Sequence, residues 1–158
     1  MLRFCSAKLL QVQTRALTHF WSTTRAREVP MHETSELGTT VRALRPFVPA
    51  KDFGVSKRFY SDLGFRAETL DAKLVEMHLG QYSFLLQDFY VAQWADNFMM
   101  HMMVDDLPAW WRHIASLNLA ARYGVENPRA PKREDWGLDV AYVFDPAGVL
   151  WHIAAVSA

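Results

Sequence analysis

Residues 98–117, FMMHMMVDDLPAWWRHIASL, predict a buried strand that leads directly into a helix. The first seven of them, 98–104, contain a single polar side chain, His101, which is typical of a strand covered on both faces. Asp105 and Asp106 can then accept hydrogen bonds from the free amides of a starting helix. Apolar side chains follow at helical spacing, at Leu107, Trp110, Ile114 and Leu117. A strand that feeds such a helix needs a sheet on which the helix can lie.

The same unit occurs earlier in the chain. Residues 41–50 are predicted to form a strand and Asp52 to cap the helix that follows. Placing one copy on the other aligns Asp52 with Asp106 at an offset of about 54 residues, which indicates an internal repeat. Two copies predict a pair of modules, because a solenoid needs about three or more repeats to bury its faces. The predicted inward positions of the first helix are Phe53, Ser56, Phe59, Tyr60 and Leu63.

Three more strands are predicted after the first helix. Gly64 is expected to end that helix in a left-handed conformation. The strands are 65–70, 73–79 and 82–88, and Gly80-Gln81 joins the last two by a tight turn. Module one is therefore predicted to have the order strand, helix, strand, strand, strand.

Module two is predicted to repeat this order with one change. A strand near 119–125 is followed by 126–137, a segment rich in proline and charge that we expect to be a loop serving as a lid or a rim. Strands 138–144 and 149–155 then form a hairpin around the turn sequence DPAG at 145–148.

Composition limits the class of protein. The chain has 158 residues, 51% hydrophobic and 22% charged, which suits one globular domain. A formal net charge of zero argues against a nucleic-acid partner, and no apolar run approaches the roughly 20 residues that span a bilayer. The single cysteine, Cys5, excludes a disulfide framework, so we expect a reducing compartment, the cytoplasm.

Residues 1–40 differ from the rest, and we expect them to be an N-terminal extension. Residues 1–27 contain Arg and Lys but no acid, a composition that overlaps with organellar transit peptides. Met31 shortly precedes the first strand, so the segment could equally be disordered chain upstream of the true start. The predicted domain is 41–156, divided into module one at 41–90, a linker at 91–97 and module two at 98–156.

These features resemble the vicinal oxygen chelate superfamily, the group of glyoxalase I, extradiol dioxygenases and bleomycin-resistance proteins. The resemblance rests on the paired modules, on DFGVSKRFYSDLGF at 52–65, on VDD at 104–106 and on DPAGVLWHI at 145–153. It implies an α+β fold of two tandem βαβββ modules whose curved mixed sheets enclose a shared cavity. It also implies a homodimer, since such chains leave sheet edges uncovered.

The metal enzymes of this superfamily carry ligands at fixed strand positions, which correspond here to Arg45, Met99, His152 and a site around Leu85 to Gln87. Only His152 is a good metal ligand among them. The guanidinium of Arg45 offers no lone pair and adds positive charge. We therefore expect no metal cofactor and a small-molecule-binding protein of the glyoxalase and bleomycin-resistance type.

A metal-dependent lyase, isomerase or dioxygenase is the alternative. His101 lies two residues beyond Met99 and so faces the same side of its strand. With His152 and either Glu76 or His78, it could form a shifted three-ligand site for zinc or iron.

The candidate ligand-binding residues are Arg45, Phe47, Met99, His101 and His152. A buried guanidinium needs either a protein carboxylate or an anionic ligand group, so the expected ligand is apolar or aromatic with an anionic group. Bleomycin is disfavoured because it is cationic and Arg45 would repel it. Trp110 and Trp111 are expected to be core and interface residues.

Overall fold

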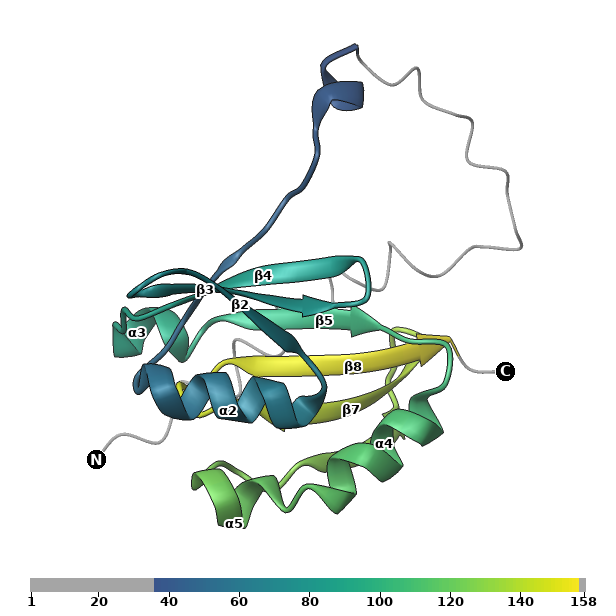
Figure 1. Ribbon diagram of the computed structural model, residues 1–158. Helices are drawn as coiled ribbons and strands as arrows, with labels where there is room; N and C mark the ends of the chain where they lie inside the picture. Colours follow the sequence, from purple (N-terminus) through teal and green to yellow (C-terminus); the bar gives the residue numbers. More distant parts are fainter. Residues whose placement is uncertain (1–35, 157–158) are drawn as a thin grey trace.

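Two four-stranded sheets form the computed structural model, which describes residues 36–156. The strand orders are β1-β4-β3-β2 and β5-β8-β7-β6, so the two modules have the same topology. In each sheet the first strand pairs in parallel with the last, and the other neighbours are antiparallel. Figure 1 shows both modules with their helices. The α+β fold of two tandem βαβββ modules is confirmed, and neither sheet closes into a barrel within residues 36–156.

Module one begins after a short 3-10 helix, η1 (Glu36–Thr40). The carboxylate of Asp52 caps the first long helix by accepting a hydrogen bond from the Val55 amide at 2.9 Å, as predicted. Gly64 ends that helix with φ at 113°, a conformation that glycine adopts without steric cost. The elements are β1 (Phe47–Pro49), α2 (Phe53–Leu63), β2 (Arg66–Asp71), β3 (Leu74–Leu79) and β4 (Tyr82–Gln87).

Module two follows a short helix in the predicted linker, α3 (Ala92–Ala95). Its first helix is capped by Asp106, which accepts a hydrogen bond from the Ala109 amide at 2.8 Å. The elements are β5 (Met99–Met103), α4 (Leu107–Ser116), α5 (Leu119–Tyr123), β6 (Arg129–Arg133), β7 (Leu138–Phe144) and β8 (Leu150–Val156).

Three predicted elements were wrong. The strand predicted at 119–125 is helix α5, because Leu119, Ala120 and Ala121 are strong helix formers. The loop predicted at 126–137 contains β6, an edge strand, where a proline is tolerated because one side of the strand needs no ladder hydrogen bond. The strand predicted at 41–50 is reduced to Phe47–Pro49, and the extension predicted at 1–40 lies mostly outside the described residues.

One hydrophobic core joins the two modules. Tyr60 on α2 lies at its centre, with its ring centroid 4.8 Å from that of Phe84 and 5.7 Å from that of Trp151. The Tyr60 hydroxyl donates to Asp145 at 2.7 Å and accepts from the indole N–H of Trp151 at 3.1 Å. Asp145 also accepts the backbone N–H of Val149, so module one is tied to the last turn of module two. The face of each sheet that points away from this core is called its outer face. Side chains on the outer faces remain available for binding.

Candidate functional site

Met99, His101 and His152 lie together on the outer face of the module-two sheet. Met99 and His101 lie two residues apart on β5, so their side chains face the same side of the sheet. His101 is paired in register with His152 on β8. The two imidazole centroids are 6.3 Å apart. Trp136 stacks near His152 with centroids 6.5 Å apart, and the Tyr142 ring meets His152 edge-on at 4.9 Å. The structure therefore assembles an aromatic and imidazole cluster here: His101, Trp136, Tyr142 and His152.

Both histidines of this cluster favour the neutral form. Partial burial lowers the pKa of His101 because the charged imidazolium is poorly solvated there. The pKa of His152 is lowered by burial and by the neighbouring His101, although the Glu134 carboxylate opposes the change. Tyr142 donates to Glu134, and burial raises the pKa of its phenol. At neutral pH the outer face thus presents two uncharged imidazoles to a ligand.

Arg45 and Phe47 lie elsewhere, on the outer side of module one. The Arg45 Nε is 2.6 Å from a carboxylate oxygen of Glu76 and donates to the Ser83 hydroxyl at 2.8 Å. The hydrogen bond from Ser83 lowers the pKa of Glu76, and the charges of Arg45 and His78 act in the same direction. The sequence predicted that Arg45 would meet either a protein carboxylate or an anionic ligand group. The structure provides the carboxylate of Glu76. Phe47 leaves 53% of its surface exposed.

His101 and His152 are neighbouring side chains with the chemistry of metal ligands, and so are Glu68, Glu76 and His78 in module one. Within residues 36–156, no three His, Cys, Asp or Glu side chains lie close enough together to hold a metal ion. Glu76 and His78 are on β3, in the other sheet, so a single chain does not bring them to the two imidazoles.

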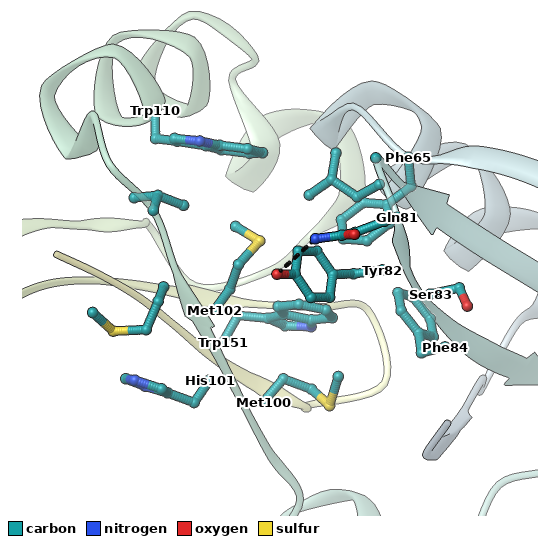
Figure 2. Close-up of a pocket in the computed structure, with 14 residues that line it drawn as sticks. Phe65, Gln81, Tyr82, Ser83, Phe84, Met100, His101, Met102, Trp110 and Trp151 are labelled. Atoms are coloured by element: carbon teal, nitrogen blue, oxygen red, sulfur yellow. Dashed lines mark hydrogen bonds between the residues drawn. The ribbon is translucent and has the colours of Figure 1, made fainter. Parts of the chain in front are cut away.

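A cavity of about 670 Å³ lies between the modules. The β3-β4 turn of module one lines one side, and β5 with α4 of module two lines the other, as Figure 2 shows. Its few polar side chains are Gln81, Ser83 and His101. The apolar wall includes Phe65, Tyr82, Phe84, Met100, Met102, Trp110 and Trp151. Among the five predicted ligand residues, His101 alone lines this cavity.

Some residues at these sites were not identified from the sequence. Trp110, predicted to be a core or interface residue, lies over the cavity in Figure 2. Tyr142 could have been found, because a hairpin centred on 145–148 pairs Tyr142 with His152. Trp136 gave no usable signal, since its position depends on the pairing of β6 with β7, and the sequence predicts a loop at β6.

Comparisons with known proteins support the same fold. No family model matches the chain. A bleomycin resistance protein of Klebsiella pneumoniae is 28% identical over 113 residues, covering 66% of this chain and 85% of that protein. The crystal structure of a bleomycin-binding protein complexed with bleomycin has a TM-score of 0.64 and 24% identity, covering 74% of this chain and 100% of the other. The lactoylglutathione lyase of Agrobacterium tumefaciens has a TM-score of 0.52 and 21% identity, covering 73% and 94%.

The chain therefore has the fold of the vicinal oxygen chelate superfamily, as the sequence resemblance indicated. Its sequence is also similar to that of a bleomycin resistance protein. None of the helices in residues 36–156 has the length and apolar character needed to cross a membrane.

Proposed function

We propose that the protein binds a small apolar or aromatic molecule with an anionic group, as a homodimer and without a metal. The observation that carries this proposal is the cavity of about 670 Å³ between the modules. Ligand pockets commonly measure about 300–1,000 Å³ and combine an apolar lining with a few polar groups. Aromatic rings and thioethers dominate this wall, and Ser83 and His101 provide polar atoms at its border.

The anionic group is assigned to Arg45 because Ser83 connects that residue to the cavity. Ser83 lines the cavity and accepts a hydrogen bond from the Arg45 Nε. Both contacts described for this guanidinium use Nε. A guanidinium has further N–H donors at its end, and a carboxylate or sulfonate can accept from them. Glu76 and Ser83 would then orient the guanidinium for the ligand.

Similarity to a bleomycin resistance protein supports the general class of function. The structure also weakens the charge argument against a cationic drug. Glu76 lies against Arg45 and offsets its positive charge, so the repulsion of a cationic drug is reduced. An anionic group would then be held mainly by hydrogen bonds from the end of the guanidinium. Bleomycin is therefore a reasonable ligand to include in a screen.

The homodimer is supported by the apolar surface that one chain leaves open. Phe47, Met99 and Met103 are 53%, 45% and 44% exposed on the outer faces. Arg45 precedes β1 of the module-one sheet and His152 is in the module-two sheet, so a second copy could bring the two groups to one site. Sedimentation at micromolar concentration should give twice the chain mass of 18.2 kDa. A monomer would restrict the site to one chain.

The cavity is tested with 8-anilinonaphthalene-1-sulfonate, an aromatic dye that carries one anionic group. Trp110→Ala should weaken dye binding by about tenfold or more, because a large aromatic wall is removed. Trp94→Ala is the matched control, since Trp94 is 66% exposed and outside the cavity. Fluorescence and calorimetric titrations measure both variants. Equal affinities for Trp110→Ala, Trp94→Ala and the wild type would reject the cavity as the binding site.

The metal-dependent enzyme remains a second candidate because His101 and His152 are neighbours. Metal analysis of protein purified without chelators separates the two functions. Stoichiometric zinc or iron that is lost in His152→Ala would favour the enzyme. Metal bound equally by the wild type and His152→Ala would not involve this pair.

A further inference from the structure

The parallel strand pairs β1-β4 and β5-β8 are equivalent, so each can be checked against the other. At one end of the pairs, the Ala50 amide donates to the Gln87 carbonyl at 3.0 Å. The Val104 amide likewise donates to the Ala154 carbonyl at 2.8 Å. The register of both ladders is therefore the same at this end.

The other end of the two pairs differs. In module two the Leu150 amide donates to the Phe98 carbonyl at 3.1 Å. By the same register, the Ser83 amide in module one should donate to the Leu44 carbonyl. Among residues 36–156 the structure gives no hydrogen bond between those two groups. Strand β1 accordingly has three residues and β5 has five.

Leu44 also differs from its counterpart in burial. Phe98 is partly buried and packs against the core, whereas Leu44 is 94% exposed. An even number of residues separates Leu44 from Val48, which is fully buried. An extended strand would therefore turn both side chains toward the same face. Figure 1 shows the chain before β1 running away from the sheets instead. An apolar side chain and an unpaired strand edge are thus exposed within a few residues of each other.

The cavity lies beside this unpaired edge. Tyr82, Ser83 and Phe84 at the start of β4 all line it. The pairing already includes Pro46, whose carbonyl accepts from the Leu85 amide at 3.0 Å. We infer that residues 42–45 form a strap that continues this parallel pairing along the edge and places Leu44 over the cavity. This inference rests on the proposed function and adds to it, because Leu44 becomes a ligand-contacting residue for an apolar molecule. The strap belongs to the same chain as the cavity that it closes.

A disulfide tests the closed register directly. Phe47 pairs with Leu85, so continuing the ladder puts Ala43 opposite Gln81. Neighbouring strands lie about 4.8 Å apart, within the range that a disulfide spans. Ala43→Cys with Gln81→Cys, in full-length chain carrying Cys5→Ser, should therefore form an intrachain disulfide on mild oxidation. Leu37→Cys with Gln81→Cys is the out-of-register control and should stay reduced.

Peptide mass mapping and non-reducing gels distinguish the results. An intrachain link between positions 43 and 81 in the test pair, with none in the control, supports the strap. Failure to link overturns it, and so does an interchain link, which would place the segment on a second copy. Equal linking in test and control would reject a defined register.

Dye titration separates this inference from the proposed function. Leu44→Ala should weaken binding of 8-anilinonaphthalene-1-sulfonate by about tenfold, because a buried leucine contact is lost. Leu37→Ala, at a residue 78% exposed and outside the predicted register, should bind like the wild type. If the wild type binds no dye while the disulfide forms, the proposed function fails and the strap register stands. Equal binding by Leu44→Ala and the wild type would overturn the role of Leu44 in the site.

Discussion

Module one and module two share a strand order and a register, yet they carry different chemistry on their outer faces. Module one presents the ion pair of Arg45 with Glu76, and His78 lies 3.7 Å from Glu76 on the same strand, β3. At the places that correspond by register to these three residues, module two has the uncharged side chains Met99, Tyr142 and Phe144. His101 and His152 lie side by side next to them. The inner faces are more alike, since Phe84 and Trp151 occupy equivalent positions and their centroids are 5.6 Å apart. The shared core preserves the repeat, and the outer faces are free to diverge.

The turn between the last two strands of each module is the sharpest difference. Module two closes with Asp145, which is 2% exposed and accepts from the Tyr60 hydroxyl and two backbone amides. Asp145→Ala should therefore lower the free energy of unfolding by about 3 kcal/mol, because buried donors lose their acceptor. Urea denaturation measures this effect. Gln81→Ala, in the exposed turn of module one, is the control and should change little. Equal losses would mean that the turns are energetically equivalent.

Asp145 also makes stability depend on pH. Burial raises its pKa to about 6 from an ordinary value of 3.8. The folded state then binds the proton more tightly than the unfolded state, so this contribution is complete below about pH 4 and is lost as pH rises toward 6. Asp145→Asn cannot titrate and should remove a change of about 2 kcal/mol across that window. Unfolding free energies at pH 4 and pH 6.5 measure it, and an unchanged slope in the variant would assign the titration elsewhere.

Arg45 and Met99 occupy equivalent positions, so they compare the modules at the proposed binding site. Arg45→Ala should weaken binding of 8-anilinonaphthalene-1-sulfonate by about 2 kcal/mol, since a charged hydrogen-bond donor is lost. Arg45→Lys should restore part of the affinity, because the charge remains and the fork is lost. Met99→Ala serves as the control and should cost less than about 1 kcal/mol, as its side chain is 45% exposed. Calorimetric titration measures all three. Equal affinities for Arg45→Ala and the wild type would show that the arginine serves the fold through Glu76.

Local signals in the sequence were sufficient for the repeated parts of the fold. Asp52 and Asp106 cap their helices as predicted, because a carboxylate before an apolar helix meets its first free amides. The alternation of side chains along β5 and the hairpin at 145–148 also explain why the sequence could place His101 and His152 at one site. These features depend on neighbours in sequence or on one strand register.

The remaining features depend on how distant segments pack. The prolines and charges of 126–137 look like a loop, but strand β7 supplies a partner that makes residues 129–133 an edge strand. Trp110 meets the cavity only because α4, which packs on β6, β7 and β8, lies across the cavity from the β3-β4 turn. Arg45, just before β1, contacts Glu76 on β3, and β4 lies between these two strands. Residue spacing along the chain does not reveal this contact. The sequence therefore predicts the modules better than it predicts the surfaces between them.

The smallest expected effect concerns His152 in the cluster on module two. Burial and the neighbouring His101 lower its pKa, and Glu134 raises it. A depressed histidine pKa means that the folded state prefers the neutral ring, so this preference reduces stability as pH falls from about 6.5 through the folded-state pKa. His101→Phe should raise the pKa of His152 by removing a neighbouring positive charge, whereas Glu134→Gln should lower it further. Trp136→Ala should also raise it, because less burial favours the charged form, and should cost about 0.5–1 kcal/mol of stability through the lost ring contact.

Nuclear magnetic resonance titration follows the imidazole signals, with exposed His113 on α4 as the internal control. If all three substitutions left the His152 titration unchanged, the rings of module two would act independently, and the outer faces of the two modules would differ in composition but not in electrostatic coupling.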